Sequence, residues 1–135
     1  MRARVTAALC LALTACASAP KLSPEATLSG AWRNADGITL SLEETGLMVI
    51  DLPGPRPRSI VGDWSLVDGV ATIRYRPESK VCVDEIGQYR LELEPSGESF
   101  SSSMVRESCD RRRTVFEGVW KRTDAGRTVP PGAAR

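Results

Sequence analysis

The chain has 135 residues, and its 18 Lys and Arg residues nearly balance its 17 Asp and Glu residues. This near-neutral charge excludes the basic surface with which proteins bind nucleic acid. The chain contains no histidine, so bases that could activate a nucleophile are scarce. We therefore expect a protein that is not an enzyme and that uses no metal or cofactor.

The first fifteen residues have the pattern of a bacterial signal peptide. Arg2 and Arg4 precede an uncharged run over residues 5–15. As a helix this run would be about 16 Å long, roughly half of a bilayer core. That is the length of a signal-peptide core rather than of a membrane span. The run ends in the letters LTAC at 13–16, which resemble the bacterial lipobox.

The lipobox resemblance implies cleavage before Cys16, whose thiol then carries a diacylglycerol. Ala17 follows instead of an aspartate, which by resemblance to sorted lipoproteins implies the outer membrane, with the chain facing the periplasm. Several acyl chains would hold the protein on the bilayer almost permanently. The alternative is an ordinary secretory signal cleaved after Ala19.

Two of the four cysteines remain available for folding, because Cys10 leaves with the signal peptide and Cys16 is acylated. The remaining pair, Cys82 and Cys109, would meet an oxidising periplasm, so we predict a disulfide between them. The competing interpretation, a metal-binding pair, lacks histidine partners.

The chain divides into one domain and two flanking segments. Residues 16–27 are predicted to form a lipidated flexible tether after the 1–15 signal peptide, and residues 123–135 a disordered tail. Both segments combine prolines and small residues without an apolar rhythm. The span 28–122 between them is long enough for one small core but not for two.

Short apolar runs separated by glycine-bearing turns fill the span 28–122, and we find no helical stripe of useful length. Asp-Gly between apolar runs is a strong hairpin signal. The pattern predicts an all-β fold, an eight-stranded antiparallel up-and-down barrel, because closure removes exposed strand edges. The expected strands cover 28–33, 38–43, 47–52, 58–67, 70–76, 88–94, 99–107 and 112–121.

Every tryptophan stands in a Gly-x-Trp segment, at 30–32, 62–64 and 118–120. Residues two apart on a strand share a face. We interpret Gly30, Gly62 and Gly118 as bend points that help a small barrel to close, with the indoles laid inward over the space beside them.

Two hairpins share the pattern G-x-W-x-x-x-D-G-[IV], yet burial predicts different turns. The first needs a three-residue loop at 35–37 with a bulge at Gly37, since a two-residue loop would set Trp32 opposite Ser41. The second needs a two-residue loop at 68–69. The predicted cross-strand pairs are Trp32 with Leu40, Gly30 with Leu42, Trp64 with Ile73 and Gly62 with Tyr75.

The Gly-Ala-Trp first strand, the eight short strands and the final Trp-Lys-Arg at 120–122 resemble a lipocalin-like barrel over residues 28–122. In lipocalins an early tryptophan closes one end of the barrel beneath an arginine from near the last strand. The resemblance implies that Trp32 is such a plug and Arg122 its lid. The domain is much shorter than a full lipocalin and shows no pattern of a C-terminal helix.

The sequence supports two kinds of function. One is binding of a small apolar ligand inside the barrel, lined by Trp32, Trp64, Tyr75, Tyr89 and Trp120. The other is an interaction with an envelope protein, as an inhibitor-like, structural or stress lipoprotein, through loops that carry Arg56, Arg58, Arg111, Arg112 and Arg113. The more ordinary interpretation of these charges is local ion pairing, because the predicted disulfide would bring Asp84 and Glu85 toward residues 111–113.

Overall fold

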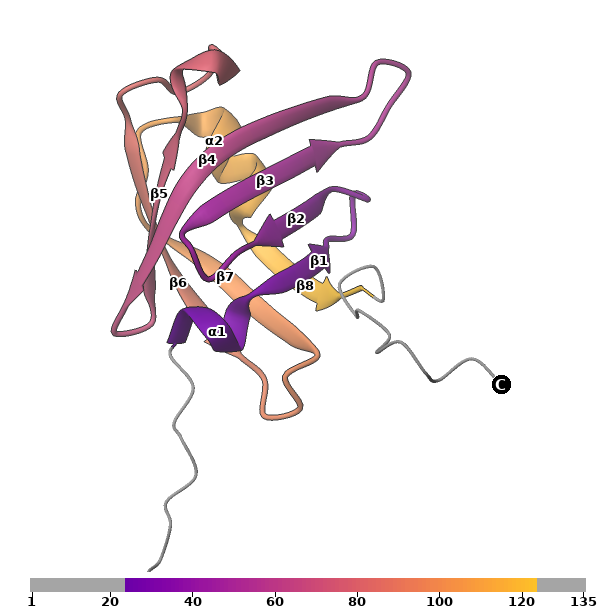
Figure 1. The fold of residues 1–135 in the computed structure, drawn as a ribbon, viewed down its shortest axis with the longest axis vertical. Helices are drawn as coiled ribbons and strands as arrows, with labels where there is room; N and C mark the ends of the chain where they lie inside the picture. Colours follow the sequence, from indigo (N-terminus) through magenta and orange to yellow (C-terminus); the bar gives the residue numbers. More distant parts are fainter. Residues whose placement is uncertain (1–23, 124–135) are drawn as a thin grey trace, which may run out of the picture.

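A computed structural model describes residues 24–123. The predicted signal peptide, the lipidation of Cys16 and the predicted tail beyond residue 123 lie outside the described residues. Eight antiparallel strands close into a barrel in which each strand pairs with its sequence neighbour and the last pairs with the first (Figure 1). The predicted fold class is therefore confirmed. Within residues 24–123, no helix has the length and apolar character needed to cross a bilayer.

The expected bounds of the first seven strands are right to within two residues. Two short helices and one 3-10 turn accompany the strands. In chain order the elements are α1 (Pro24–Leu28), β1 (Gly30–Arg33), β2 (Thr39–Leu42), β3 (Leu47–Leu52), β4 (Arg58–Val67), β5 (Val70–Tyr75), η1 (Pro77–Ser79), β6 (Ile86–Leu93), β7 (Ser99–Arg106), α2 (Asp110–Phe116) and β8 (Gly118–Arg122).

The expected last strand, 112–121, is wrong over its first half, which belongs to helix α2. Asp110 in the first turn complements the positive end of the helix dipole. Arg112 and Phe116, four residues apart and therefore on one helix face, are its buried residues. The chain thus covers the barrel with a helix before it enters β8.

The predicted tether is also too long at its C-terminal end, because α1 occupies four of its residues, 24–27. Pro24 stands at the first helical position, where its missing N–H costs no hydrogen bond, and Leu28 is buried. At the other terminus Thr123, predicted to begin the disordered tail, donates its amide hydrogen to the Ala31 carbonyl at 2.9 Å.

Both predicted hairpin registers are confirmed. Trp32 pairs with Leu40 across a three-residue loop, in which Gly37 has a φ of 77°. Trp64 pairs with Ile73 across the two-residue loop of Asp68 and Gly69, whose φ angles of 50° and 76° are those of a type I′ turn. The buried face of each strand therefore determined its register. The predicted pairs Gly30 with Leu42 and Gly62 with Tyr75 are present as well.

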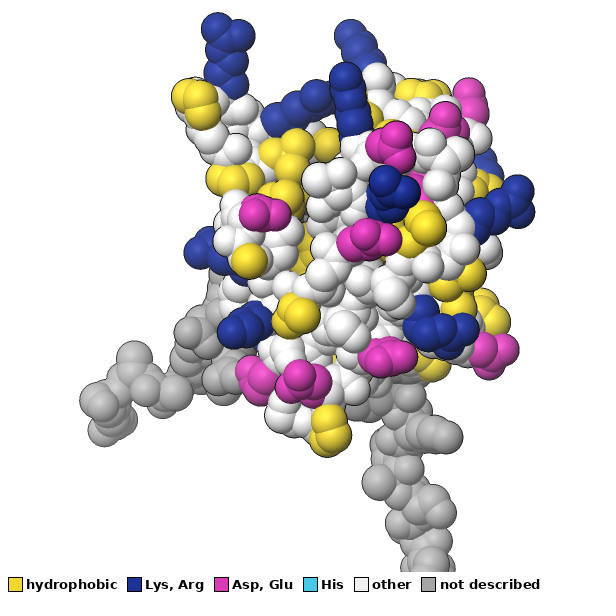
Figure 2. Space-filling view, turned by 180° about the vertical axis from the view of Figure 1, so that it is seen from behind, with side chains coloured by type: hydrophobic (Ala, Val, Ile, Leu, Met, Phe, Trp, Pro, Cys, Tyr) yellow, Lys and Arg dark blue, Asp and Glu magenta, His cyan; other side chains and the backbone are white. Residues whose placement is uncertain are grey.

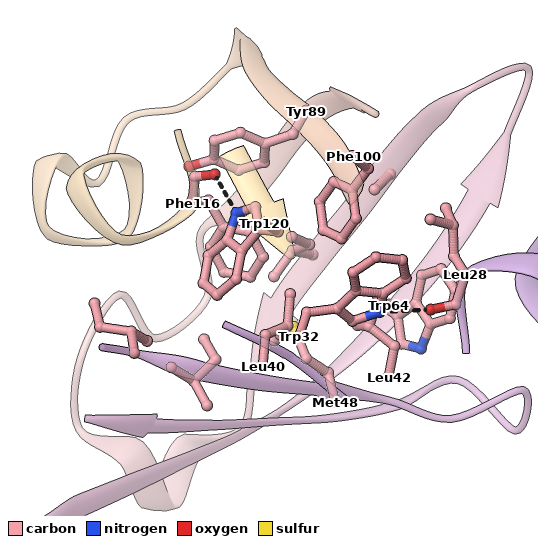
Figure 3. Packing of buried hydrophobic residues seen from close by; sticks show 14 of the residues in the cluster. Leu28, Trp32, Leu40, Leu42, Met48, Trp64, Tyr89, Phe100, Phe116 and Trp120 are labelled. Atoms are coloured by element: carbon pink, nitrogen blue, oxygen red, sulfur yellow. Dashed lines mark hydrogen bonds between the residues drawn. The ribbon is translucent and has the colours of Figure 1, made fainter. Parts of the chain in front are cut away.

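Aromatic side chains fill the interior of the barrel (Figure 3). The Trp32 and Phe100 rings meet edge to face with centroids 4.7 Å apart, and Phe100 stacks on Trp120 at 6.3 Å. Phe116 of α2 extends this row, with its ring centroid 6.2 Å from that of Trp120 and 5.2 Å from that of Tyr89. The row joins the core beneath α1 to the core beneath α2.

Two of the Gly-x-Trp segments share an arrangement that explains their spacing. Each follows a short helix by one residue, and its glycine, Gly30 or Gly118, has a φ of 125°. The Trp32 indole donates to the Leu28 carbonyl at 2.9 Å, and the Trp120 indole donates to the Phe116 carbonyl at 3.1 Å. In both cases the acceptor is the last residue of the helix. The glycine therefore turns the chain from helix into strand, and the indole satisfies a helix-end carbonyl.

The third segment works differently. Gly62 lies in the middle of β4, where a Cβ atom would approach the Met48 side chain and the Arg74 carbonyl to 2.7 Å. The Trp64 indole donates to the Glu43 carbonyl at 2.9 Å in the turn between β2 and β3. All three indoles point inward, as predicted.

The indoles do not fill the space beside Gly30 and Gly118, and that part of the prediction is wrong. A Cβ at position 30 would meet Arg122 Nη1 at 2.9 Å, whereas nothing lies within 4 Å of one at position 118. The conformation at Gly118, rather than a close contact, is what requires glycine there.

The α1 end of the barrel is closed. Arg122 Cζ lies 4.1 Å from the centroid of the Trp32 ring, which is the contact that the lipocalin-like resemblance implies. Strand β8 pairs with β1 through only Trp32 with Arg122 and Arg33 with Lys121. At the opposite end of the barrel lie the β3–β4 hairpin, η1 and α2 (Figure 1).

Candidate functional site

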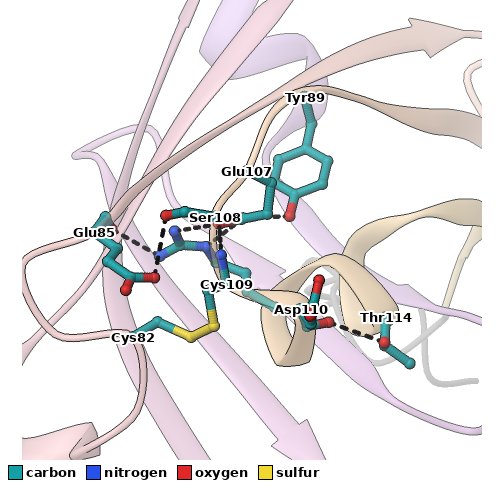
Figure 4. Close-up of polar contacts among 9 residues, drawn as sticks. Cys82, Glu85, Tyr89, Glu107, Ser108, Cys109, Asp110 and Thr114 are labelled. Carbon is teal, nitrogen blue, oxygen red and sulfur yellow. Dashed lines mark hydrogen bonds and ion pairs between the residues drawn. A yellow bond between two sulfur atoms is a disulfide. The ribbon is translucent and has the colours of Figure 1, made fainter.

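The end of the barrel formed by the β3–β4 hairpin, η1 and α2 is held together by a disulfide between Cys82 and Cys109 (Figure 4). The bond joins loop 80–85, which follows η1, to the residue that precedes α2, and it confirms the predicted pairing. Lys80, Cys82 and Asp84 have φ angles of 54°, 51° and 64°, which few residues other than glycine adopt. Such strained backbone gathers at functional sites, so this loop is a candidate.

Beneath the disulfide lies a buried ion pair between Glu107 and Arg112, whose side chains have no exposed surface. Arg112 donates from Nε to one carboxylate oxygen at 2.6 Å and from Nη2 to the other at 2.8 Å. Glu107 also accepts from the Tyr89 hydroxyl and from the Cys109 amide. Arg112 Nη1 donates to the Glu85 carbonyl at 2.9 Å. The cluster thus joins loop 80–85, β6 and α2.

The protonation of this cluster follows from its contacts. Burial alone would raise the pKa of Glu107, but hydrogen bonds from Arg112, Tyr89 and the Cys109 amide, with the charge of Arg112, hold that pKa below its usual value. Burial, together with the hydrogen bond to Glu107, raises the pKa of Tyr89. At neutral pH Glu107 is therefore charged and Tyr89 is a donor. A carboxylate with all these partners is not free to act as a base.

Gly87 of β6 provides the room for this ion pair. A Cβ at this position would collide with Glu107 Oε2 and would lie 2.8 Å from Arg112 Nε. The residue is buried within the strand. A side chain here would push the ion pair away from the sheet, so the cluster depends on glycine at position 87.

A pocket of about 90 Å³ opens beside the cluster, between the strand ends and α2. We call it the arginine pocket, because three arginines and no acidic residue line it together with apolar side chains. Arg112 Cζ lies 5.0 Å from the centroid of the Tyr75 ring, and burial raises the Tyr75 pKa. The lining residues are Leu52, Arg58, Ile60, Tyr75, Val81, Arg111, Arg112 and Val115.

A second hollow, of about 610 Å³, lies beside the disulfide and is partly acidic. Figure 2 shows basic side chains that project from this end of the barrel beside a group of acidic ones. Charges of opposite sign therefore mark neighbouring parts of the same end. The hollow is lined by Thr72, Asp84, Glu85, Ile86, Gln88, Arg106, Glu107 and Ser108.

One group of potential metal ligands occurs here. The side-chain donor atoms of Cys82, Glu85 and Cys109 lie within 4.8 Å of one another. The two sulfurs are bonded to each other and are not thiolates, which are the form of cysteine that binds metals. The Glu85 carboxylate instead accepts a hydrogen bond from Ser108 Oγ at 3.3 Å.

The aromatic residues predicted to line a ligand cavity are buried and pack into the core. Their exposed fractions lie between 0% and 4%. Ligand sites for small molecules usually occupy about 300 Å³ or more. Of this group, Tyr75 lines the arginine pocket, whose volume is about 90 Å³. The set comprises Trp32, Trp64, Tyr75, Tyr89 and Trp120.

The arginines predicted to contact a partner have four different environments. Arg58 and Arg111 line the arginine pocket, and Arg56 is exposed in the β3–β4 hairpin. Arg113 is paired within α2 at 3.4 Å. Arg112 is wrong as a surface contact, because its buried guanidinium neutralises the carboxylate beneath the disulfide.

Ion pairing across the disulfide is also a wrong prediction. Within residues 24–123, neither Asp84 nor Glu85 forms an ion pair with residues 111–113; Glu85 reaches Arg112 only through its backbone carbonyl. The ion pairs in this part of the chain are Arg76 with Asp63, Arg112 with Glu107 and Arg113 with Asp110.

Sequence analysis missed Glu107, which stands at the end of the expected strand 99–107. The helix that follows left a usable signal. Asp110 precedes Arg112, Val115 and Phe116, a spacing that places the last three on one face of a helix. An arginine on a helix's inner face requires a buried acid nearby.

No protein-family model, no curated protein and no solved structure matches this chain. Any proposal for the function of this end of the barrel therefore depends on its geometry and charge.

Proposed function

We propose that this chain is a non-enzymatic envelope lipoprotein that binds another protein through the end of the barrel carrying the arginine pocket. The observation that carries the proposal is the pocket itself: Arg58 and Arg111 line it, and no residue of its lining is acidic. The disulfide holds the neighbouring loop 80–85 in place. A rigid, locally charged rim gives specificity without a large loss of entropy on binding.

The position of the N-terminal segment supports this role. Helix α1 lies at the end of the barrel opposite η1 and α2 (Figure 1). Eight residue steps separate Cys16 from Pro24, which at full extension span about 28 Å. A lipid on Cys16 would hold the α1 end near the outer membrane, and the arginine pocket would face the periplasm.

The apolar-ligand hypothesis has less support. The aromatic side chains that were predicted to line a cavity pack against one another in the core instead. The arginine pocket, of about 90 Å³, is too small for a ligand of lipid size. Titration of tryptophan emission with fatty acids tests this second hypothesis. A saturable change would favour it over the interaction role.

Site-specific photocrosslinking in living cells tests the interaction role. A crosslinking amino acid at position 111 or position 56 is expected to capture one discrete partner. The control position is Val67, which is 68% exposed at the end of β4, next to the β4–β5 turn at the other end of the barrel. Equal capture from position 67, or no capture from 56 and 111, would refute the proposed surface.

Charge reversal provides an independent measurement. Arg56→Glu is expected to abolish the crosslink formed from position 111, and Arg111→Glu the crosslink formed from position 56, because the rim then repels an acidic partner. The matched controls are Arg33→Glu and Arg90→Glu, each of which reverses one exposed arginine elsewhere on the barrel. Equal effects of the control and rim variants would show that net charge, rather than this surface, drives binding.

The lipid anchor has its own test. Metabolic labelling with palmitate is expected to mark the wild-type chain and not Cys16→Ser. Cell fractionation should then find wild type in the outer membrane and Cys16→Ser in the soluble periplasm. Label on Cys16→Ser would contradict the lipobox prediction.

A further inference from the structure

Tyr75, one of the residues that line the arginine pocket, has a buried hydroxyl group without a hydrogen-bond partner. Tyr75 is 2% exposed, and its Oη finds neither donor nor acceptor among the described residues. A buried hydroxyl without a partner is unfavourable, and native structures seldom tolerate one without a reason. The other such group in this part of the chain, Ser102 Oγ, belongs to β7 and does not line the pocket. Tyr75 therefore has an unused donor at a lining position.

The charge around this donor is positive and only partly neutralised. Arg112 is neutralised by Glu107 through two hydrogen bonds. Arg58 donates to the Ser79 carbonyl at 2.6 Å, and neither Arg58 nor Arg111 forms an ion pair within residues 24–123. Two arginines without an ion-pair partner among the described residues thus line the same pocket as Tyr75.

We propose that the arginine pocket binds the carboxylate of an Asp or Glu side chain from the partner protein. The carboxylate accepts the hydrogen bond that Tyr75 Oη leaves unused and is attracted by Arg58 and Arg111. Both interactions are charge-assisted, which makes them stronger than hydrogen bonds between neutral groups. This inference rests on the proposed interaction role and specifies the chemistry of the partner.

The size of the pocket favours an acidic side chain over a longer anion. A volume of about 90 Å³ is well below the roughly 300 Å³ or more of usual small-molecule sites. It accommodates a carboxylate with one or two methylene groups, and the apolar lining of Leu52, Ile60 and Val115 suits those methylenes. A chain terminus would also need backbone donors, and the charged lining groups here are side chains.

Small carboxylates test the inference on the full lipidated chain in detergent micelles. Propionate is expected to shift the NMR signals of Val81 and Val115 amides saturably. Propionamide, which has the same shape without the charge, should bind at least tenfold more weakly. Equal binding of the two compounds would overturn the proposal.

Variants separate the site from general attraction to arginines. Tyr75→Phe is expected to weaken propionate binding about tenfold without lowering the melting temperature, because the lost hydroxyl had no partner. Arg111→Gln should weaken it similarly, and the exposed control Arg33→Gln should leave it unchanged. Unaltered binding to Tyr75→Phe would show that water alone satisfies the hydroxyl and would refute the site.

Peptides distinguish the source of the carboxylate. A pentapeptide with a central glutamate and amidated C-terminus is expected to bind at least tenfold more tightly than its glutamine counterpart. Binding only by a glutamate-free peptide with a free C-terminus would contradict the assignment to a side chain. If crosslinks form from positions 56 and 111 but no carboxylate binds, the carboxylate inference fails and the interaction role stands. If carboxylates bind but no crosslink forms, the interaction role is refuted, the carboxylate is not a partner protein's, and only the affinity of the pocket for carboxylates stands.

Discussion

Arg122, on the last strand, stacks its guanidinium 4.1 Å from the ring centre of Trp32, on the first strand. Its nitrogens also donate to three backbone carbonyls, those of Gly97 at 3.0 Å, Ser29 at 2.9 Å and Thr27 at 3.2 Å. One side chain therefore links the tryptophan plug, the end of α1 and the β6–β7 turn.

Arg122→Met is expected to lower the free energy of unfolding by about 2–3 kcal/mol, because it removes these hydrogen bonds and the cation–π contact but keeps an apolar stem. Arg122→Lys keeps the positive charge but lacks the planar guanidinium group. Its free energy of unfolding should therefore lie between those of wild type and Arg122→Met. Urea unfolding measures both. Arg33→Met alters an exposed side chain of β1 and should change stability by less than about 0.5 kcal/mol; a similar loss there would contradict the role of Arg122.

Alanine at the two helix-to-strand glycines is expected to destabilise the fold unequally. Gly118→Ala adds only the strain of a φ of 125°, about 1–3 kcal/mol. Gly30→Ala adds the same strain and a contact of 2.9 Å with Arg122 Nη1, so its loss should be larger. In the double variant Gly30→Ala with Arg122→Met, the loss of stability should be smaller than the sum of the losses in the two single variants. Equal losses at both glycines, with strict additivity, would contradict the close contact.

The buried ion pair predicts how stability changes with acid. The pKa of Glu107 is lower in the folded chain than its ordinary value of 4.5, so the unfolded chain takes up the proton first as the pH falls. The stabilisation is present in full above pH 4.5 and is lost as the pH falls through the folded pKa. Glu107→Gln lacks this contribution and leaves Arg112 unpaired, so we expect a loss of about 3–5 kcal/mol at pH 7.

The measurement is urea unfolding between pH 7 and pH 3. The gap in stability between wild type and Glu107→Gln should narrow below pH 4.5. Glu117→Gln, which changes an exposed acid at the end of α2, should run parallel to wild type. Curves for Glu107→Gln that stay parallel to wild type would refute the low pKa.

Removal of the disulfide is expected to cost about 3–4 kcal/mol, because the bond closes a loop with a sequence separation of 27. Cys82→Ala with Cys109→Ala should show this loss, and dithiothreitol should bring wild type to a similar midpoint. Denaturant unfolding with and without reductant makes the comparison. A shift of the double variant by reductant would indicate that the effect has another origin.

The barrel and its registers were predictable because burial constrains strands strongly. A slip of one residue would have turned Trp32 toward Ser41 and exposed its ring, so alternation alone selected the bulged first turn. The disulfide followed from the count of cysteines together with the predicted oxidising compartment. Both inferences use signals that a single sequence carries.

The helices and the candidate site were less predictable, each for its own physical reason. The inner face of α2 includes Arg112, and a pattern analysis counts arginine as facing solvent. The burial of Arg112 depends on Glu107, which precedes the disulfide-bonded Cys109 and lies outside the helix. Helix α1 has only five residues, too few for a periodic stripe. The unpartnered hydroxyl of Tyr75 depends on three-dimensional packing that no spacing reveals.

The short pairing of β1 with β8 would have a mechanical consequence for a chain tethered to the membrane as proposed. Any pull on a lipid at Cys16 would enter the domain through α1 and then β1, which is joined to β8 by only two residue pairs. Arg122 donates hydrogen bonds to the Thr27 and Ser29 carbonyls at the end of α1, where that force would enter the barrel. The pairing of β1 with β8, which is the shortest in the barrel and is reinforced by the Arg122 guanidinium, would then determine the force at which the two strands separate and the barrel opens.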